Sequence, residues 1–275
     1  MSPFALETIW HWTAVAFYIV GMAGFAWALF FDKPERIRLV TAITALGLVP
    51  HTTALVLRYF HVGHGPYMMK YEVLSSNAWI AIAMLVLFVW RKPNWGALAL
   101  IALPAAILMM GLGLSTNPEA RNLPPTLRSI WLIYHILFAK LSVGAFLMSA
   151  AAAVALLRKL GGASGRWVDR LPGPEVVEAY IFRFIGFGFV FWTMTIAAGA
   201  IWANQSWGRY WGWDPIESWS LVTWLAYAIL LHARLFFKPT ARAVAWGTLA
   251  CFVVSVLTVL IFPFLFPSMH SAYFQ

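Results

Sequence analysis

Three tryptophans crowd one short segment of the sequence. Trp207, Trp211 and Trp213 fall within seven positions, Gly208 and Gly212 separate them, and Arg209 lies at the centre. Aromatic faces stack on flat apolar ligands, glycines let the backbone approach closely, and a guanidinium pairs with carboxylates. Haem is flat and carries two propionates. Anchoring at a bilayer surface explains each tryptophan singly, but not the glycines and the arginine. The pattern predicts a haem-binding surface over residues 204–217.

The residues after the tryptophans have the pattern of a helix start. Asp214 fits the N-cap, Pro215 the first helical position and Glu217 the third, as in a capping box. Asp214 therefore has two interpretations, as part of the ligand surface or as the start of a helix.

Seven histidines are the candidate metal ligands. His135 and His270 lie near the ends of apolar spans, on the side predicted for the tryptophans. Two neutral imidazoles from different segments can hold a haem iron from both faces. His232 is predicted roughly 25 Å further down its helix at 1.5 Å per residue. It therefore marks either a second, inner site or an interfacial side chain beside Arg234.

The other four histidines receive structural predictions. His51, inside a span, is predicted to pack between helices. His61 and His64 are predicted to be solvated in a loop, where a metal or a substrate could still reach them. His11 is predicted to lie at the bilayer interface.

The composition indicates a membrane as the solvent. Of the 275 residues, 62% are hydrophobic and only 11% are charged, against roughly a quarter charged in soluble domains. A membrane helix needs about 20 mostly apolar residues. The fold class predicted is an all-α polytopic membrane helix bundle, a single integral membrane domain over residues 1–275 with about eight transmembrane helices. The spans are Ile9–Phe31, Leu39–Leu57, Val73–Trp90, Trp95–Thr116, Ile130–Leu157, Phe184–Trp207, Ser218–Ala233 and Ala243–Phe266.

The charge distribution sets the predicted orientation. Thirteen of the 19 Lys and Arg lie in one set of alternate connections, five lie in the other, and Lys140 lies within a span. The positive-inside rule places the richer set in the cytoplasm, so both termini and the tryptophan segment are predicted outside. The net charge of +9 then needs no nucleic acid partner. The first span is too long for a cleavable signal peptide and lacks a basic leader.

Two further features limit the chemistry. The connection Lys159–Glu178 is rich in Gly and Pro and separates the first five predicted spans from the last three, either as a hinge or as a plain loop. Cys251 is the single cysteine, so the chain forms no internal disulfide, and thiol chemistry requires cysteines from a partner.

The segment from Trp207 to Pro215 resembles the tryptophan-rich signature of haem-handling proteins of cytochrome c maturation. Further segments favour the CcsA-type cytochrome c synthase subunit over the CcmC and CcmF types, as does the count of eight spans. They are Leu55–Arg58 with Gly63–Pro66 and Tyr71-Glu72, Glu217–Trp224 leading to His232-Ala233-Arg234, and Met269–Tyr273.

The resemblance implies a set of roles. His135 and His270 ligate haem iron at the outer face, and His232 belongs to a lower haem site completed by a ResB/CcsB-like membrane subunit. The implied cofactor is haem b, as substrate and transient ligand, and the implied partner is apocytochrome c. The membrane is a bacterial inner (plasma) membrane or a thylakoid membrane, with the active loop on the periplasmic or lumenal side.

Three functions are candidates for a chain with these features. The first is haem transport and covalent attachment to the cysteines of apocytochrome c within a cytochrome c haem lyase complex. Here Arg209, with Arg128 or Arg121, holds the propionates, and no residue of the chain acts as an acid or base. The second is a haem exporter without ligase activity. The third, an electron-transfer subunit with a bis-histidine haem, leaves the tryptophan cluster unexplained.

Overall fold

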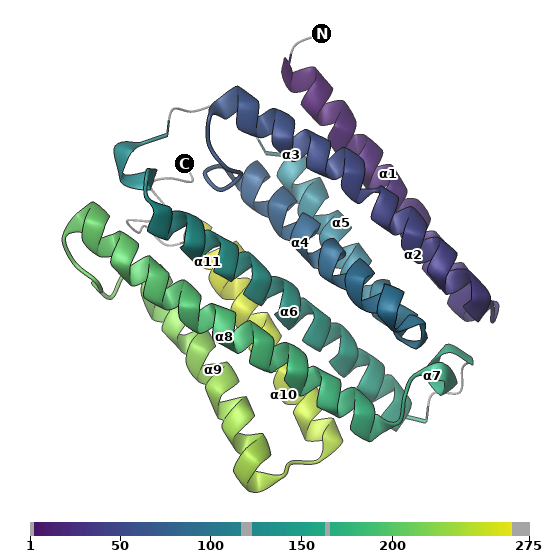
Figure 1. Cartoon of the computed structure of the whole chain (residues 1–275). Coiled ribbons are helices and arrows are strands. Elements are labelled where there is room, and N and C mark those ends of the chain that lie inside the picture. Colours follow the sequence, from purple (N-terminus) through teal and green to yellow (C-terminus); the bar gives the residue numbers. More distant parts are fainter. Residues whose placement is uncertain (1–2, 117–122, 163–165, 266–275) are drawn as a thin grey trace. The chain divides into compact units, whose positions relative to one another are not determined.

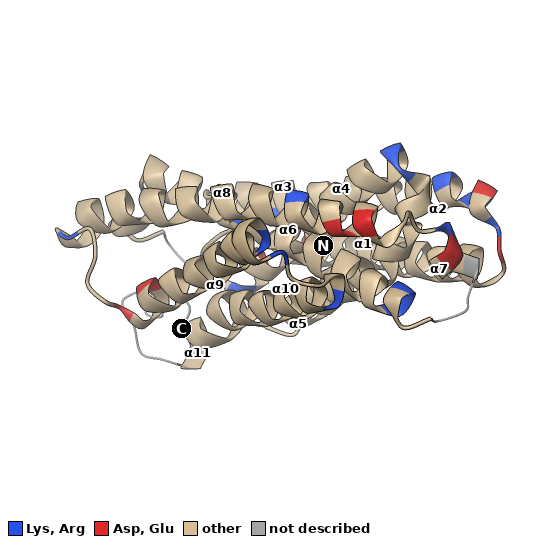
Figure 2. Ribbon diagram, turned by 90° about the horizontal axis from the view of Figure 1, so that it is seen from below, with Lys and Arg blue, Asp and Glu red and all other residues tan. Residues whose placement is uncertain are grey.

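Long apolar helices dominate the residues that the structure describes, which are 3–116, 123–162 and 166–265 in a computed structural model of the chain (Figure 1). No strand occurs in these ranges. Figure 2 shows that the ribbons of α8 and α10 carry no charged residue over most of their length. The helices and their apolar surfaces confirm the predicted all-α membrane fold.

Eight helical segments within the described ranges are long and apolar enough to span a bilayer, as predicted. Most are longer than the predicted spans, because the predicted spans end at charged residues and the helices continue through them. Glu7 lies inside the first and Arg234 inside the seventh. The segments are Phe4–Phe30, Pro34–Val62, Lys70–Arg91, Pro93–Leu114, Ile130–Leu160, Pro174–Trp207, Pro215–Phe237 and Ala241–Ile261. The chain is a multi-pass membrane protein.

One compact unit contains residues 1–122 and 157–177. In it α1 packs against α2, α3 and α5, and α4 packs against α5. The short 3-10 helices η1 and η2 each begin at a proline and connect neighbouring spans. The helices of this unit are α1 (Pro3–Phe30), η1 (Pro34–Arg36), α2 (Ile37–Leu46), α3 (Leu48–Val62), α4 (Lys70–Arg91), η2 (Pro93–Leu98), α5 (Ala99–Leu114) and α7 (Arg166–Arg170).

The second span is interrupted at Gly47, between α2 and α3. Pro50 has no N–H to donate to the carbonyl of Leu46, and its ring crowds that carbonyl, so the helix cannot run through without a break. Gly47 also lies against α1, because a Cβ there would come within 2.7 Å of the Tyr18 ring. The break therefore coincides with a close helix contact.

The second compact unit contains residues 123–156 and 178–275. Its helices α6 and α8 touch, since the Ser142 hydroxyl donates to the Gly188 carbonyl at 2.7 Å. Helices α9 and α10 also pack together. The helices of this unit are η3 (Pro125–Leu127), α6 (Ile130–Leu160), α8 (Pro174–Trp207), α9 (Pro215–Phe237), α10 (Ala241–Val256), the π-helical turn η4 (Leu257–Ile261) and α11 (Phe262–Leu265); the ends of α6 and α8 fall in the first unit.

The division between units differs from the one that the Gly- and Pro-rich connection suggested. Most of that connection, through Val177, groups with the first four spans, and the fifth span up to Leu156 groups with the last three. The reason is packing, since α6 contacts α8 along its length through Ser142, Phe146 and His135. The description of the whole chain as a single domain stays a prediction.

A buried ion pair stabilises the loop between α3 and α4. Arg58 Nε donates to Glu72 Oε1 at 2.8 Å, and Glu72 Oε2 accepts from the amides of Met68 and Met69 at 2.9 and 3.1 Å. Arg58 and Glu72 are 2% and 1% exposed. Arg58 lies within α3, which continues to Val62, so the predicted end of the second span at Leu57 is five residues too early.

Three predictions for histidines are corrected here and one is confirmed. His64, predicted to be solvated, is buried and contributes Nδ1 to a 2.8 Å bond with the Gly65 carbonyl. His61 lies in α3 with its side chain 27% exposed rather than in a loop. His11 is buried rather than interfacial, because it bonds to Ser75 across the helix interface. His51 packs between helices, as predicted.

We expect Arg58→Met to destabilise the protein by about 3–5 kcal/mol, because it leaves the Glu72 carboxylate buried without its cation. Thermal unfolding in lipid nanodiscs measures the loss. The control is Arg170→Ala, which removes a pair with Asp32 whose side chains are 34% and 32% exposed, and exposed pairs contribute about 0–1 kcal/mol. Equal losses of stability in both variants would contradict the conclusion that Arg58 and Glu72 form a stabilising buried ion pair.

Candidate functional site

His135 is held in one orientation at the start of α6. Its Nδ1 lies 2.8 Å from the Thr195 carbonyl of α8. A carbonyl can only accept, so Nδ1 carries the proton and the lone pair of the neutral imidazole lies on Nε2. The ring also lies 6.2 Å from the Trp202 ring at an interplanar angle of 30°. Metal-ligating histidines commonly donate their other ring N–H to a backbone carbonyl in this way, which fixes the tautomer and the ring orientation.

Gly199 lets His135 come this close to α8. A Cβ at Gly199 would lie 2.6 Å from His135 Nδ1 and 3.0 Å from Cε1. Real Cβ atoms essentially never come within 3.0 Å of another side chain, so the position of the imidazole depends on the absence of a side chain at Gly199. The sequence reasoning missed both Gly199 and Thr195. The small residues Ala197 to Ala200 were the available signal, because small residues let membrane helices approach.

The tryptophan segment is shorter as a loop than predicted. Helix α8 continues to Trp207 and α9 begins at Pro215, which leaves residues 208–214 between them, so the predicted bounds 204–217 included helical residues. Gly208 ends α8 with φ of 73°, and its N–H donates to the Asn204 carbonyl at 2.9 Å. This is the left-handed helix ending that favours glycine.

Glu217 organises the loop. Its Oε2 accepts from the amides of Gly212 and Asp214 at 2.8 and 3.2 Å. Asp214 Oδ1 accepts from the amide of Ile216 at 2.9 Å, which confirms the predicted capping box. Of the two interpretations of Asp214, the structure supports the helix start. Glu217 has a second role besides capping the helix, because it accepts a hydrogen bond from Gly212 and so connects the loop to α9.

The three tryptophans have different surroundings. Trp207 packs on Trp202 with ring centroids 4.9 Å apart. Trp211 and Trp213 meet edge to face at 5.7 Å. Trp213 has a φ of 58° and is 71% exposed. A left-handed backbone is uncommon for a bulky residue and costs free energy, and here it holds an indole outward from the loop.

Of the three candidate propionate partners, Arg209 and Arg128 belong to the same unit, and Arg121 lies outside the described residues. Arg209 is half-buried and packs on Gly212, where any Cβ would overlap its guanidinium. Arg128 is exposed at the end of η3. The segment before α6 is fastened to α8, because the Trp202 indole and the Ser206 hydroxyl both donate to the Thr126 carbonyl, at 2.8 and 3.0 Å.

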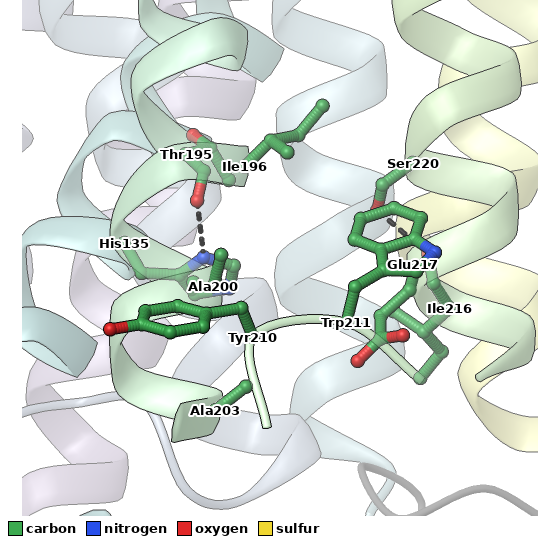
Figure 3. Close-up of a pocket in the computed structure, with 11 residues that line it drawn as sticks. His135, Thr195, Ile196, Ala200, Ala203, Tyr210, Trp211, Ile216, Glu217 and Ser220 are labelled. Atoms are coloured by element: carbon green, nitrogen blue, oxygen red, sulfur yellow. Dashed lines mark hydrogen bonds between the residues drawn. The ribbon is translucent and has the colours of Figure 1, made fainter. Parts of the chain in front are cut away.

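An open pocket, about 410 Å³ when the solvent space at its mouth is included, lies where these elements meet. Figure 3 shows His135 and Tyr210 on one side and Trp211 and Glu217 on the other. Its walls come from α6, α8, the loop and α9. The residues that line it are His135, Thr195, Ile196, Gly199, Ala200, Ala203, Tyr210, Trp211, Ile216, Glu217 and Ser220. The structure thus brings His135 and the tryptophan loop together, as predicted.

The histidine predicted for the inner site, His232, is not among the residues that line this pocket. His232 is exposed near the other end of α9, stacked on Phe236 at 4.2 Å. Beside it Arg234 pairs with Glu178 and lies 4.2 Å from the Phe182 ring. His270 lies outside the described residues.

Eight apolar spans and an aromatic loop beside a fixed histidine define a polytopic membrane protein with a polar–aromatic site at the ends of its helices. The family model described as Cytochrome C assembly protein matches residues 10–270, and the chain belongs to this family. Cytochrome c biogenesis is therefore the process in which it takes part.

Individual relatives agree with this assignment. The cytochrome c biogenesis protein CcsA of Synechococcus sp. (strain CC9902) is 31% identical over 266 residues, covering 85% of this chain and 86% of the relative. The protein of the same name from Lemna minor is 32% identical, covering 74% and 75%. The structure of the cytochrome c heme lyase CcmF matches the whole chain with a TM-score of 0.73 at 16% identity. The chain spans 49% of that protein, so this match concerns the fold alone.

We expect Gly199→Ala to destabilise the protein by about 1–3 kcal/mol, the usual cost of overpacking, because its methyl group overlaps His135. Gly186→Ala on the same helix is the control, since a Cβ there meets nothing within 4 Å and alanine is the better helix former. Thermal unfolding of the two variants in nanodiscs tests this. A Gly199→Ala protein as stable as the control would show that the close contact does not exist.

Proposed function

We propose that the chain binds haem in the pocket beside His135 and presents it to apocytochrome c for covalent attachment, as part of a cytochrome c synthase. The observation that carries the proposal is the bond from His135 Nδ1 to the Thr195 carbonyl, 2.8 Å long. It puts the proton on Nδ1 and the lone pair on Nε2, the tautomer that a haem iron binds, and the ring lines a pocket that Trp211 also lines. Membership of the cytochrome c assembly family supports the same ligand class.

The loop supplies surfaces for a flat ligand. Trp211 lines the pocket and Trp213 projects from the loop, so aromatic faces are available for stacking on a porphyrin. Arg209 and Arg128 are the cations for the two propionates. Trp207, Gly208, Gly212 and Asp214 act indirectly, because they set the end of α8, the path of the loop and the start of α9.

Two more histidines complete the proposal. His270 provides the second axial ligand to the same iron. His232, at the far end of α9, belongs to a lower haem site whose other ligand comes from a ResB/CcsB-like subunit. The exposure of His232 is consistent with a ligand shared with a partner. Haem b would enter at the lower site and leave at the upper one, on the periplasmic or lumenal side.

The chemical step needs little from this chain beyond positioning. A cysteine thiol of apocytochrome c adds across a haem vinyl group, so that a carbon–sulfur bond forms and the thiol proton ends on the terminal vinyl carbon. Apocytochrome c brings two cysteines and a histidine that replaces one axial ligand. Holding both reactants in place is a large contribution by itself, and no side chain in the pocket needs to act as an acid or a base.

We expect His135→Ala to lower the yield of holocytochrome c by about tenfold or more, because losing a metal ligand costs at least as much as losing its supporting hydrogen bond. The measurement is haem-stained cytochrome c after co-expression with the partner subunit and an apocytochrome. Added imidazole should restore part of the yield. Tyr134→Ala, an exposed neighbour on α6, is the control. A wild-type yield from His135→Ala without imidazole would remove His135 from the site.

An exporter that passes haem to a separate ligase would use the same pocket. Only a synthase needs to hold the acceptor, so we expect a biotinylated peptide with the Cys-x-x-Cys-His sequence to capture the chain with its partner subunit. The comparison is the same peptide with both cysteines and the histidine replaced by serine. Haem-loaded protein that ignores both peptides would favour the exporter.

A further inference from the structure

A continuous row of hydrogen bonds runs through the interior of the first unit, whereas the site described above belongs to the second unit. The Tyr71 hydroxyl lies 2.7 Å from His11 Nδ1, and His11 Nε2 lies 2.8 Å from the Ser75 hydroxyl. Ser75 in turn lies 2.9 Å from His51 Nε2, and His51 Nδ1 lies 3.0 Å from the Tyr18 hydroxyl. The row joins α1, α3 and α4, and each of its five residues is at most 2% exposed.

A buried carboxylate lies at one end of the row. Glu7 is fully buried, and neither of its oxygens has a hydrogen bond of normal geometry within the described residues. The Tyr71 hydroxyl and the His61 ring are its polar neighbours, with His61 Nδ1 3.5 Å from Oε2. His61 is 27% exposed and lies one residue before the end of α3, so this end of the row reaches the surface at a helix end. The other end, at Tyr18, is closed.

The proton positions along the row follow from its acceptors. The Glu7 carbonyl lies 3.3 Å from His11 Nδ1 and can only accept, which favours a proton on Nδ1. His11 Nε2 then accepts from Ser75, Ser75 accepts from His51 Nε2, and His51 Nδ1 accepts from Tyr18. Every donor in the row therefore points toward Tyr71 and Glu7.

We propose that this row is a proton relay, which exchanges a proton between external water at Glu7 and His51 in the bundle interior. Intramembrane chains of acidic residues and histidines are typical of proton relays. The relay is a second activity of the chain, separate from the proposed haem site. The mouth at Glu7 lies on the side that the sequence predicts to be external.

The transfer balances at every step. Starting from a His51 that is protonated on both nitrogens, its Nε2 proton moves to Ser75, and the Ser75 proton moves to His11 Nε2. His11 gives its Nδ1 proton to Tyr71, which gives its phenolic proton to Glu7. Each residue between His51 and Glu7 gives up one proton and gains one, so the charge moves from His51 to Glu7, where the carboxylate becomes a carboxylic acid. His11 ends with its proton on Nε2 and His51 ends neutral with its proton on Nδ1. Loading His51 is the reverse process and starts from these tautomers.

Few other ionisable groups face the relay. Helices α2 and α5 also pack on α1, and the residues they bury are apolar or threonine. Arg58 lies 5.6 Å from the Tyr71 ring and is neutralised by Glu72 at 2.8 Å. Besides His11 and His51 themselves, the ionisable groups along the row and at its ends are Glu7, Tyr18, Arg58, His61, Tyr71 and Glu72.

The test uses the whole chain in lipid nanodiscs with ¹⁵N-labelled histidine and tryptophan, and measures deuterium exchange of the ring N–H of His11, His51 and Trp95 by NMR. Ser75→Ala cuts the row between them. We expect exchange at His51 to slow by about tenfold or more, equivalent to about 1.4 kcal/mol of added barrier, while exchange at His11 changes little. Glu7→Gln should slow both.

Two further variants separate transfer from packing. Ser75→Thr keeps the hydroxyl and should restore exchange at His51 even if Ser75→Ala folds poorly. Thr41→Val removes a buried hydroxyl of the same unit that bonds only within its own helix, to the Ile37 carbonyl at 2.7 Å, and should leave both rates unchanged. Equal exchange at His51 in wild type and folded Ser75→Ala would overturn the proposal. So would wild-type His51 exchange no faster than that of the buried Trp95 indole.

Discussion

Backbone amides in a loop between two membrane helices need hydrogen-bond acceptors from the protein wherever water does not reach them. This constraint shapes the loop before α4 and the loop before α9. In each loop a glutamate at the third position of the following helix provides the acceptor. Glu72 accepts from Met68 and Met69, and Glu217 accepts from Gly212 and Asp214. The helix start and the loop path therefore depend on one carboxylate in each case.

The two glutamates differ in what they hold in place. Glu72 is paired with Arg58 and closes a loop that covers buried polar residues. Glu217 keeps Trp211 at the pocket wall, next to a histidine fixed by a different contact, the Thr195 carbonyl. Rigid helices and a tied loop are what a site needs when its main contribution is to hold two reactants together.

The buried polar groups also separate by unit. In the second unit His135 lies at the end of its helix, where a ligand can reach it. In the first unit His11 and His51 lie deep among helices and are satisfied by Ser75, Tyr18 and Tyr71. Burying a polar side chain costs free energy unless it is hydrogen-bonded. The position of His135 therefore depends on the Thr195 carbonyl, and the positions of His11 and His51 depend on Ser75, Tyr18 and Tyr71.

The sequence by itself determined the eight spans, the capping box at Asp214 and the tryptophan cluster, because apolar length and local spacing set these features along one segment. It did not reveal that His11 and His64 are buried, that Arg58 belongs to a helix interior, or that Gly199 admits His135. Those features depend on which helix faces meet. His11 and Ser75 are 64 residues apart in the chain, and His135 and Thr195 are 60 apart. Periodicity within one helix identifies its faces but not their partners, so only the tertiary structure decided which side chains come together.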